Sequence, residues 1–178
     1  HNNVHIKNDY VNLEDSNSRA IWALGQVVSE AHNLPPEYIK RAKSCMDKAR
    51  TWIPGVLSPR SIAFTIKGLY LYLENFEDEE FKKAIEDLAQ NLISRYDLNR
   101  EKDWEWFEEY LTYANSILPE AMLLAFLTTG KKVYKKTALE SFEFLLSRMF
   151  KNGNFKVVSN KGWHQKHIEP EKYGEQPI

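Results

Sequence analysis

The chain has 178 residues, of which 43% are apolar and 28% charged, so it encodes a folded globular protein and not a disordered segment. Its 24 Lys and Arg residues balance 25 Asp and Glu residues, and the net charge of -1 argues against general nucleic-acid binding. The single cysteine, Cys45, excludes an internal disulfide, and no apolar run approaches the roughly 20 residues that a membrane span requires. Residues 1–7 lack the apolar core of a signal peptide, so none is expected, and the cytoplasm is the expected compartment.

The spacing of apolar residues, together with start and stop signals, predicts six helices and an all-α fold class. Asp15 or Ser16 is expected to cap the first helix, and Ser58 with Pro59 opens the third. Gly130 is a stop signal after the fifth helix. In chain order, the predicted ranges are 16–32, 36–52, 58–75, 78–98, 116–129 and 131–151.

The predicted helices are of two kinds, which alternate along the chain. The second, fourth and sixth are amphipathic, and the apolar stripe of the sixth is Tyr134, Ala138, Phe142, Leu145 and Met149. The first, third and fifth are apolar nearly all round, so burial on most sides is expected. An inner layer wrapped by an outer layer is typical of an α/α toroid or a helical solenoid, and a plain six-helix bundle is the alternative.

Two segments between or after the helices are long and rich in aromatic residues. The connection over 99–115 is aromatic and acidic, and we predict a short helix within it, over 104–111. Residues 153–163 alternate weakly and carry turn residues at both ends, which indicates a hairpin or an extended loop. Loops of this length within a domain are usually functional.

The candidate site residues precede the inner helices or lie in the tail. Indole rings offer apolar platforms for the C–H faces of sugars, and carboxylates accept hydrogen bonds from sugar hydroxyls. A carboxylate that such rings desolvate can act as a general acid. The candidates are Asp15, Arg19, Trp104, Trp106, Glu108, Tyr113, Asn115, Asn160, Trp163, His164, Glu175 and Gln176.

Structural roles are open for the same residues. Trp104 and Phe107 suit a core, Glu108 a solvated helix position, and Asp15 a helix cap. The His164-x-x-His167-x-Glu169 spacing is not diagnostic, so neither a metal nor another cofactor is expected, and no phosphate loop or dinucleotide motif is present. Cys45 is expected to pack as a small apolar residue.

The sequence resembles a group of bacterial and archaeal proteins of the six-hairpin glycosidase-like type, often attached to or encoded near sugar-transferring enzymes. The matching segments cover residues 13–25, 104–108, 111–115, 118–121, 153–155, 158–163 and 173–178. The resemblance implies an (α/α)6 toroid and a carbohydrate-related role, and it does not specify the reaction. The sequence departs from the family at Ala114 and at Gly174-Glu175, where acidic residues or Gln often stand.

The resemblance also implies that the ring is incomplete. A ring of six hairpins needs twelve helices, and the chain encodes six, so we expect about half a ring in one domain over 1–178 with an irregular tail over 152–178. Three hairpins leave apolar flanks uncovered, and such surfaces usually mark an interface. We therefore expect pairing with a second copy or with the missing part of the toroid.

Three functions are compatible with these patterns. The first is a glycoside-processing enzyme, a hydrolase or glycosyltransferase type that binds a carbohydrate ligand. In it, Asp15 and Glu108 form the carboxylate pair with Glu175 as a substitute, and the polar and aromatic candidates hold the sugar. The second is a helical-hairpin module that binds a glycan or a protein without chemistry. The third is a sugar epimerase, for which only His164 and His167 are available.

Overall fold

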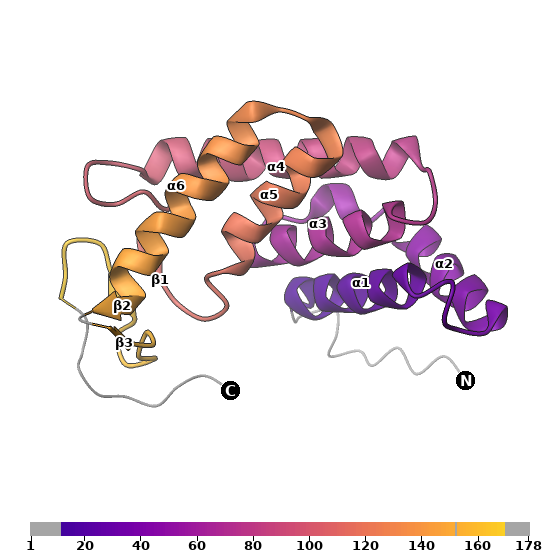
Figure 1. Ribbon diagram of the computed structural model, residues 1–178, viewed down its shortest axis with the longest axis horizontal. Helices are drawn as coiled ribbons and strands as arrows, with labels where there is room; N and C mark the ends of the chain where they lie inside the picture. The colour runs from indigo at the N-terminus through magenta and orange to yellow at the C-terminus, as the bar shows by residue number, and fades with distance from the viewer. Residues whose placement is uncertain (1–11, 152, 170–178) are drawn as a thin grey trace. The chain divides into compact units, whose positions relative to one another are not determined.

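The computed structural model describes residues 12–151 and 153–169, and this part of the chain is mostly helical, which confirms the all-α prediction (Figure 1). It divides into two compact units, residues 1–88 and 89–178, with the boundary inside α4. The elements are α1 (Glu14–Ser29), α2 (Pro36–Ala49), the 3-10 turn η2 (Ile53–Gly55), α3 (Pro59–Leu73), α4 (Glu79–Asn99), β1 (Tyr110–Leu111), α5 (Ile117–Thr129), α6 (Lys132–Met149), β2 (Phe150–Lys151), β3 (Asn154–Phe155) and β4 (His164–Gln165). No described helix is long and apolar enough to cross a membrane.

The first unit is built around α3, which lies against α1 (Figure 1). The two helices approach so closely that a Cβ atom on Gly25 would lie 2.2 Å from the carbonyl oxygen of Gly68. Thr65 donates a hydrogen bond of 3.2 Å to Ser18 in the same buried seam. Small residues on both helices therefore allow backbone-to-backbone packing, and Gly25 and Gly68 have no room for a larger side chain.

The expectation of burial on most sides is confirmed for α3 and is wrong for α1 and for α5 (Ile117–Thr129), in which Leu123 and Leu127 are 39% and 56% exposed. All residues of α3 from Arg60 to Ile66 are buried, whereas Ala20 and Ala23 of α1 are exposed. The buried stripe of α1 is narrow and consists of Ser18, Ile21, Gly25 and Val28. Alanine is apolar but small, so Ala20 and Ala23 extend the apolar pattern of the sequence without requiring a second packing partner.

The start of α1 also differs from the prediction. The helix begins at Glu14, and Leu13 stands at the cap position without a side-chain cap hydrogen bond, so neither Asp15 nor Ser16 is the cap. The carboxylate of Glu14 instead accepts hydrogen bonds from the backbone N–H groups of Leu57 (2.5 Å) and Ser58 (2.6 Å), at the entry to α3. The expectation that Cys45 packs as a small apolar residue is also wrong, because Cys45 is exposed on α2.

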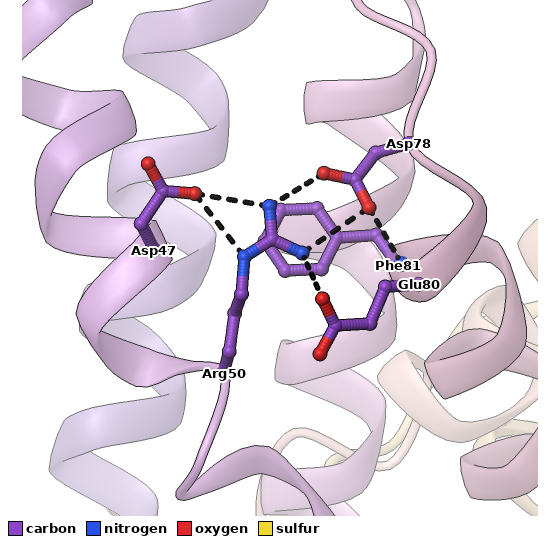
Figure 2. Close-up of polar contacts among 5 residues, drawn as sticks. All are labelled: Asp47, Arg50, Asp78, Glu80 and Phe81. Atoms are coloured by element: carbon purple, nitrogen blue, oxygen red, sulfur yellow. Dashed lines mark hydrogen bonds and ion pairs between the residues drawn. The ribbon is translucent and has the colours of Figure 1, made fainter.

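Arg50 joins the end of α2 to the start of α4 in the first unit (Figure 2). Its guanidinium binds the carboxylates of Asp47 (2.9 Å), Asp78 (2.5 Å) and Glu80 (2.9 Å), and it lies 4.0 Å from the centroid of the Phe81 ring. Asp78 also accepts a hydrogen bond from the Phe81 N–H at 3.0 Å, which caps the first turn of α4. Arg50 therefore holds the start of α4 in place.

The helices of the second unit follow the predicted ranges closely. Gly130 ends α5 in the left-handed conformation (φ +71°), and α5 and α6 form a hairpin (Figure 1). The core-facing side of α6 is Tyr134, Thr137, Ala138, Ser141, Phe144 and Leu145. The predicted stripe was wrong at Phe142, which is 44% exposed, because Ser141 and Thr137 occupy core positions that an apolar pattern does not reveal.

The segment over 104–111 is not helical, which corrects the predicted short helix. Trp104 pairs with Glu101 in an isolated β-bridge, Asp103 has a φ of +68°, and Tyr110–Leu111 form β1. β1 pairs antiparallel with β4, and β2 pairs antiparallel with β3. The hairpin of β2 and β3 begins earlier than the predicted range of 153–163, because α6 ends at Met149 and Phe150–Lys151 form its first strand. The chain after it returns to the connection between α4 and α5.

An ion-pair group holds this return segment. Lys166 lies 2.9 Å and His167 lies 2.7 Å from the carboxylate of Glu101. The ammonium of Lys166 also donates a hydrogen bond of 2.8 Å to the backbone carbonyl of Asn99. The residues around His164 are thus attached to the 99–111 connection by a two-residue strand pair and by one lysine.

Candidate functional site

Asp15 and Arg19 lie one turn apart on α1 in the first unit, as predicted. Their side chains form an ion pair of 2.7 Å, and each is about two-fifths exposed, at 41% and 42%. The guanidinium of Arg19 lies 4.2 Å from the centroid of the Phe64 ring, and Trp22 stacks on the same ring at 5.5 Å. The sequence thus places a carboxylate, a guanidinium and an indole on one face of α1.

Trp104 and Trp106 lie in the core of the second unit. They are 3% and 0% exposed, and Trp104 makes an edge contact with Phe144 at 5.1 Å. The indole N–H of Trp104 donates to the backbone carbonyl of Glu108 at 2.8 Å. Neither indole presents a ring face to solvent, and Glu108 itself is half-buried beside them.

Asn115 and Tyr113 lie in the turn before α5. The Asn115 side chain is buried and both accepts from and donates to the backbone of Thr112, at 3.0 Å and 2.8 Å, so it holds the turn. Tyr113 is 36% exposed and lines an apolar groove with Phe142, Leu146, Phe150 and Phe155. This groove lies along the exposed face of α6.

The predicted tail residues are partly outside the described region. Glu175 and Gln176 lie outside it, and Asn160 is exposed. Trp163 is half-buried and has a φ of +54°. His164 is half-buried on β4, and its ring meets the ring of Trp104 edge-on at 5.6 Å. Among the described tail candidates, His164 lines a hollow.

Two hollows, of about 170 Å³ and 420 Å³, share the lining residues Arg148, His164 and Glu169, and together they form what we call the Arg148 cleft. Trp104 also lines the larger hollow. The other charged or titratable residues that line the cleft are Lys102, Asp103, Lys156 and His167. All of them belong to the second unit.

The charge state of His164 follows from its surroundings. Burial lowers its pKa, the positive charges of Arg148 and Lys156 lower it further, and Glu169 opposes them. The imidazole is therefore neutral at pH 7, with one nitrogen that donates and one that accepts hydrogen bonds. A neutral imidazole that shares a hollow with a guanidinium and a carboxylate can either donate a hydrogen bond to a hydroxyl group or accept one from it.

The sequence did not point to Arg148 as a site residue. An arginine in the last turn of an amphipathic helix is ordinary, because it complements the negative end of the helix dipole. Its role depends on β4, which brings His164 back beside α6, and a strand pair of two residues leaves no periodic signal. Glu169 had a weak signal in the His164-x-x-His167-x-Glu169 spacing, but His167 contacts Glu101, and no group of three or more metal-type side chains gathers in the described residues.

Comparison with known protein families, curated proteins and solved structures found no match to this chain.

Proposed function

We propose that this chain is a carbohydrate-active protein of the glycoside-processing type, built as about half of an α/α toroid, and that the Arg148 cleft holds a sugar. The observation that supports this proposal is the combination of Arg148, neutral His164 and Glu169 in one hollow. A guanidinium donates, a carboxylate accepts, and a neutral imidazole does both, which matches the mixed donors and acceptors around a sugar ring. The motif resemblance supports the same class of ligand.

The sugar proposal is tested by ligand-observed NMR and by product formation, with a panel of glycans and sugar nucleotides. We expect a bound sugar, and we expect His164→Ala and Glu169→Gln to weaken its binding by about tenfold each, because each change removes hydrogen bonds to the ligand. Gln90→Ala, at an exposed position of α4 in the same unit, is the matched control and should change nothing. No binding by any member of the panel would contradict the proposal.

Chemistry at Asp15 and Glu108 is tested separately from binding. If either carboxylate acts in glycoside processing, its amide variant, Asp15→Asn or Glu108→Gln, should abolish turnover. Unchanged turnover in both variants would overturn the assignment. The alternative, a binding module without chemistry, is favoured by the burial of Trp104 and Trp106, which leaves no open indole platform at these positions. It predicts binding without any product.

We also propose that a second copy of this chain covers the exposed face of α6. Leu139, Phe142 and Leu146 are 48%, 44% and 37% exposed and lie one or two turns apart, so they form an apolar stripe. Phe142→Gln should shift the protein from dimer to monomer in light scattering coupled to gel filtration. Glu143→Gln, on the neighbouring exposed position, should leave the dimer intact, and a monomeric parent protein would contradict the proposal.

A further inference from the structure

The position of Arg148 is fixed before any ligand binds. It lies in the last turn of α6, and its Nη2 donates a hydrogen bond to the backbone carbonyl of Asp103. The guanidinium also lies 5.0 Å from the centroid of the Phe144 ring and 6.0 Å from that of Trp104. Aromatic faces and one carbonyl therefore hold the cation at the cleft, and little side-chain entropy remains to be lost on binding.

Arg148 keeps unused hydrogen-bond donors. Among residues 12–151 and 153–169, no carboxylate forms an ion pair with it. Its Nε–H is buried and has no hydrogen-bond partner within the described part of the chain. Buried N–H groups in proteins nearly always have a partner, so this donor is left for an acceptor that the described residues do not supply.

The charges around the cleft favour a negative acceptor over a neutral one. Arg148, Lys102 and Lys156 supply three cations, and Asp103 and Glu169 supply two anions. His164 is neutral, because burial and then the charges of Arg148 and Lys156 lower its pKa against the opposing effect of Glu169, so it adds no charge to this balance. Glu169 repels an anion beside it, so a ligand that suits the cleft carries both a negative group for Arg148 and hydroxyls for Glu169.

We propose that the sugar held in the Arg148 cleft bears an oxyanion group, a carboxylate or a phosphate, that Arg148 binds while Glu169 accepts hydrogen bonds from its hydroxyls. This inference rests on the proposed carbohydrate function and narrows it to acidic sugars. The planar guanidinium matches both groups, because each presents two oxygen atoms to a pair of parallel N–H donors. The Lys156 ammonium adds attraction through charge alone.

The test compares matched ligands on the full 178-residue chain by calorimetry and NMR. Glucose, galactose and mannose are titrated beside their uronates and their 6-phosphates, with inorganic phosphate as a separate arm. We expect an acidic sugar to bind at least about tenfold more tightly than its neutral parent, which is the usual advantage of a charge-assisted pair. The uronate and phosphate arms distinguish the two sources of the oxyanion.

Two variants test which residues cause the preference for acidic over neutral sugars. Arg148→Gln should remove it, and Lys156→Gln should reduce it by about threefold without risk to the fold, because Lys156 is exposed. Circular dichroism checks that Arg148→Gln remains folded. Equal binding of acidic and neutral sugars to the parent protein overturns this inference and leaves the proposed function standing. Binding of phosphate alone, with no sugar of the panel, overturns both.

Discussion

Replacing Gly25 by alanine is expected to lower the free energy of unfolding by about 3 kcal/mol or more, the upper range for overpacking a tight contact. The added Cβ would lie 2.2 Å from the carbonyl oxygen of Gly68, and backbone atoms cannot rotate away as a side-chain tip can. In a helix, alanine is more favourable than glycine by about 1 kcal/mol. The steric cost exceeds this gain, so the variant is expected to be less stable. Urea denaturation followed by circular dichroism measures the change.

The reciprocal variant and an open glycine provide the controls. Gly68→Ala places a Cβ 2.5 Å from the carbonyl oxygen of Ile21 and should be as destabilising as Gly25→Ala. Gly55→Ala meets nothing within 4 Å and has an ordinary φ, so its effect should stay within about 1 kcal/mol. If Gly25→Ala proves as mild as Gly55→Ala, α1 and α3 do not approach each other through Gly25.

Replacing Arg50 by methionine should lower the free energy of unfolding by about 2–3 kcal/mol, the range for hydrogen bonds to charged groups. The change leaves Asp78, 14% exposed, without its cation (Figure 2). It also removes the cation from the Phe81 ring. Lys83→Met, which breaks an exposed pair with Asp87 on the same helix, is the matched control and should cost at most about 1 kcal/mol.

The Arg50 contact should also make stability depend on pH. Hydrogen bonds from Arg50 hold the pKa of the Asp78 carboxyl below its usual value of 3.8, so folding favours the ionised form. The stabilisation is therefore complete above that pH and is lost as the pH falls through the lower pKa of the folded state. Asp78→Asn removes this dependence, so the stability difference between parent and variant should shrink in acid. A constant difference down to pH 2 would contradict the assignment.

The helices were predictable because their signals are local. Pro36, Pro59 and Gly130 placed helix ends to within a few residues, and the predicted range of the fourth helix, 78–98, differs from that of α4 by one residue at each end. The errors arose where contacts with other parts of the chain determine the local structure. Phe142 points outward because Ser141 enters the core, and the segment after Trp104 is not helical, since its end at Tyr110 pairs with the distant Gln165. Periodicity does not encode pairings between residues far apart in the chain.

The candidate site was predictable in part for the same reason. His164 was identified as a polar residue in a long tail, and the structure places it in a cleft. Arg148 could not be found, because its neighbours Asp103 and His164 reach it only through the fold. Trp104 and Trp106 were predicted to be sugar-binding platforms, but both are buried, because large aromatic side chains pack equally well in a core.

The attachment of the return segment has a kinetic consequence. Lys166 reaches the carbonyl of Asn99 across 67 positions of sequence, so the cleft is assembled from opposite ends of its unit. Closing so large a loop is slow compared with forming the α5–α6 hairpin, whose contacts are local. The Arg148 cleft is therefore expected to be the last part of this unit to fold, and amide protons of β4 should exchange with solvent before those of α6.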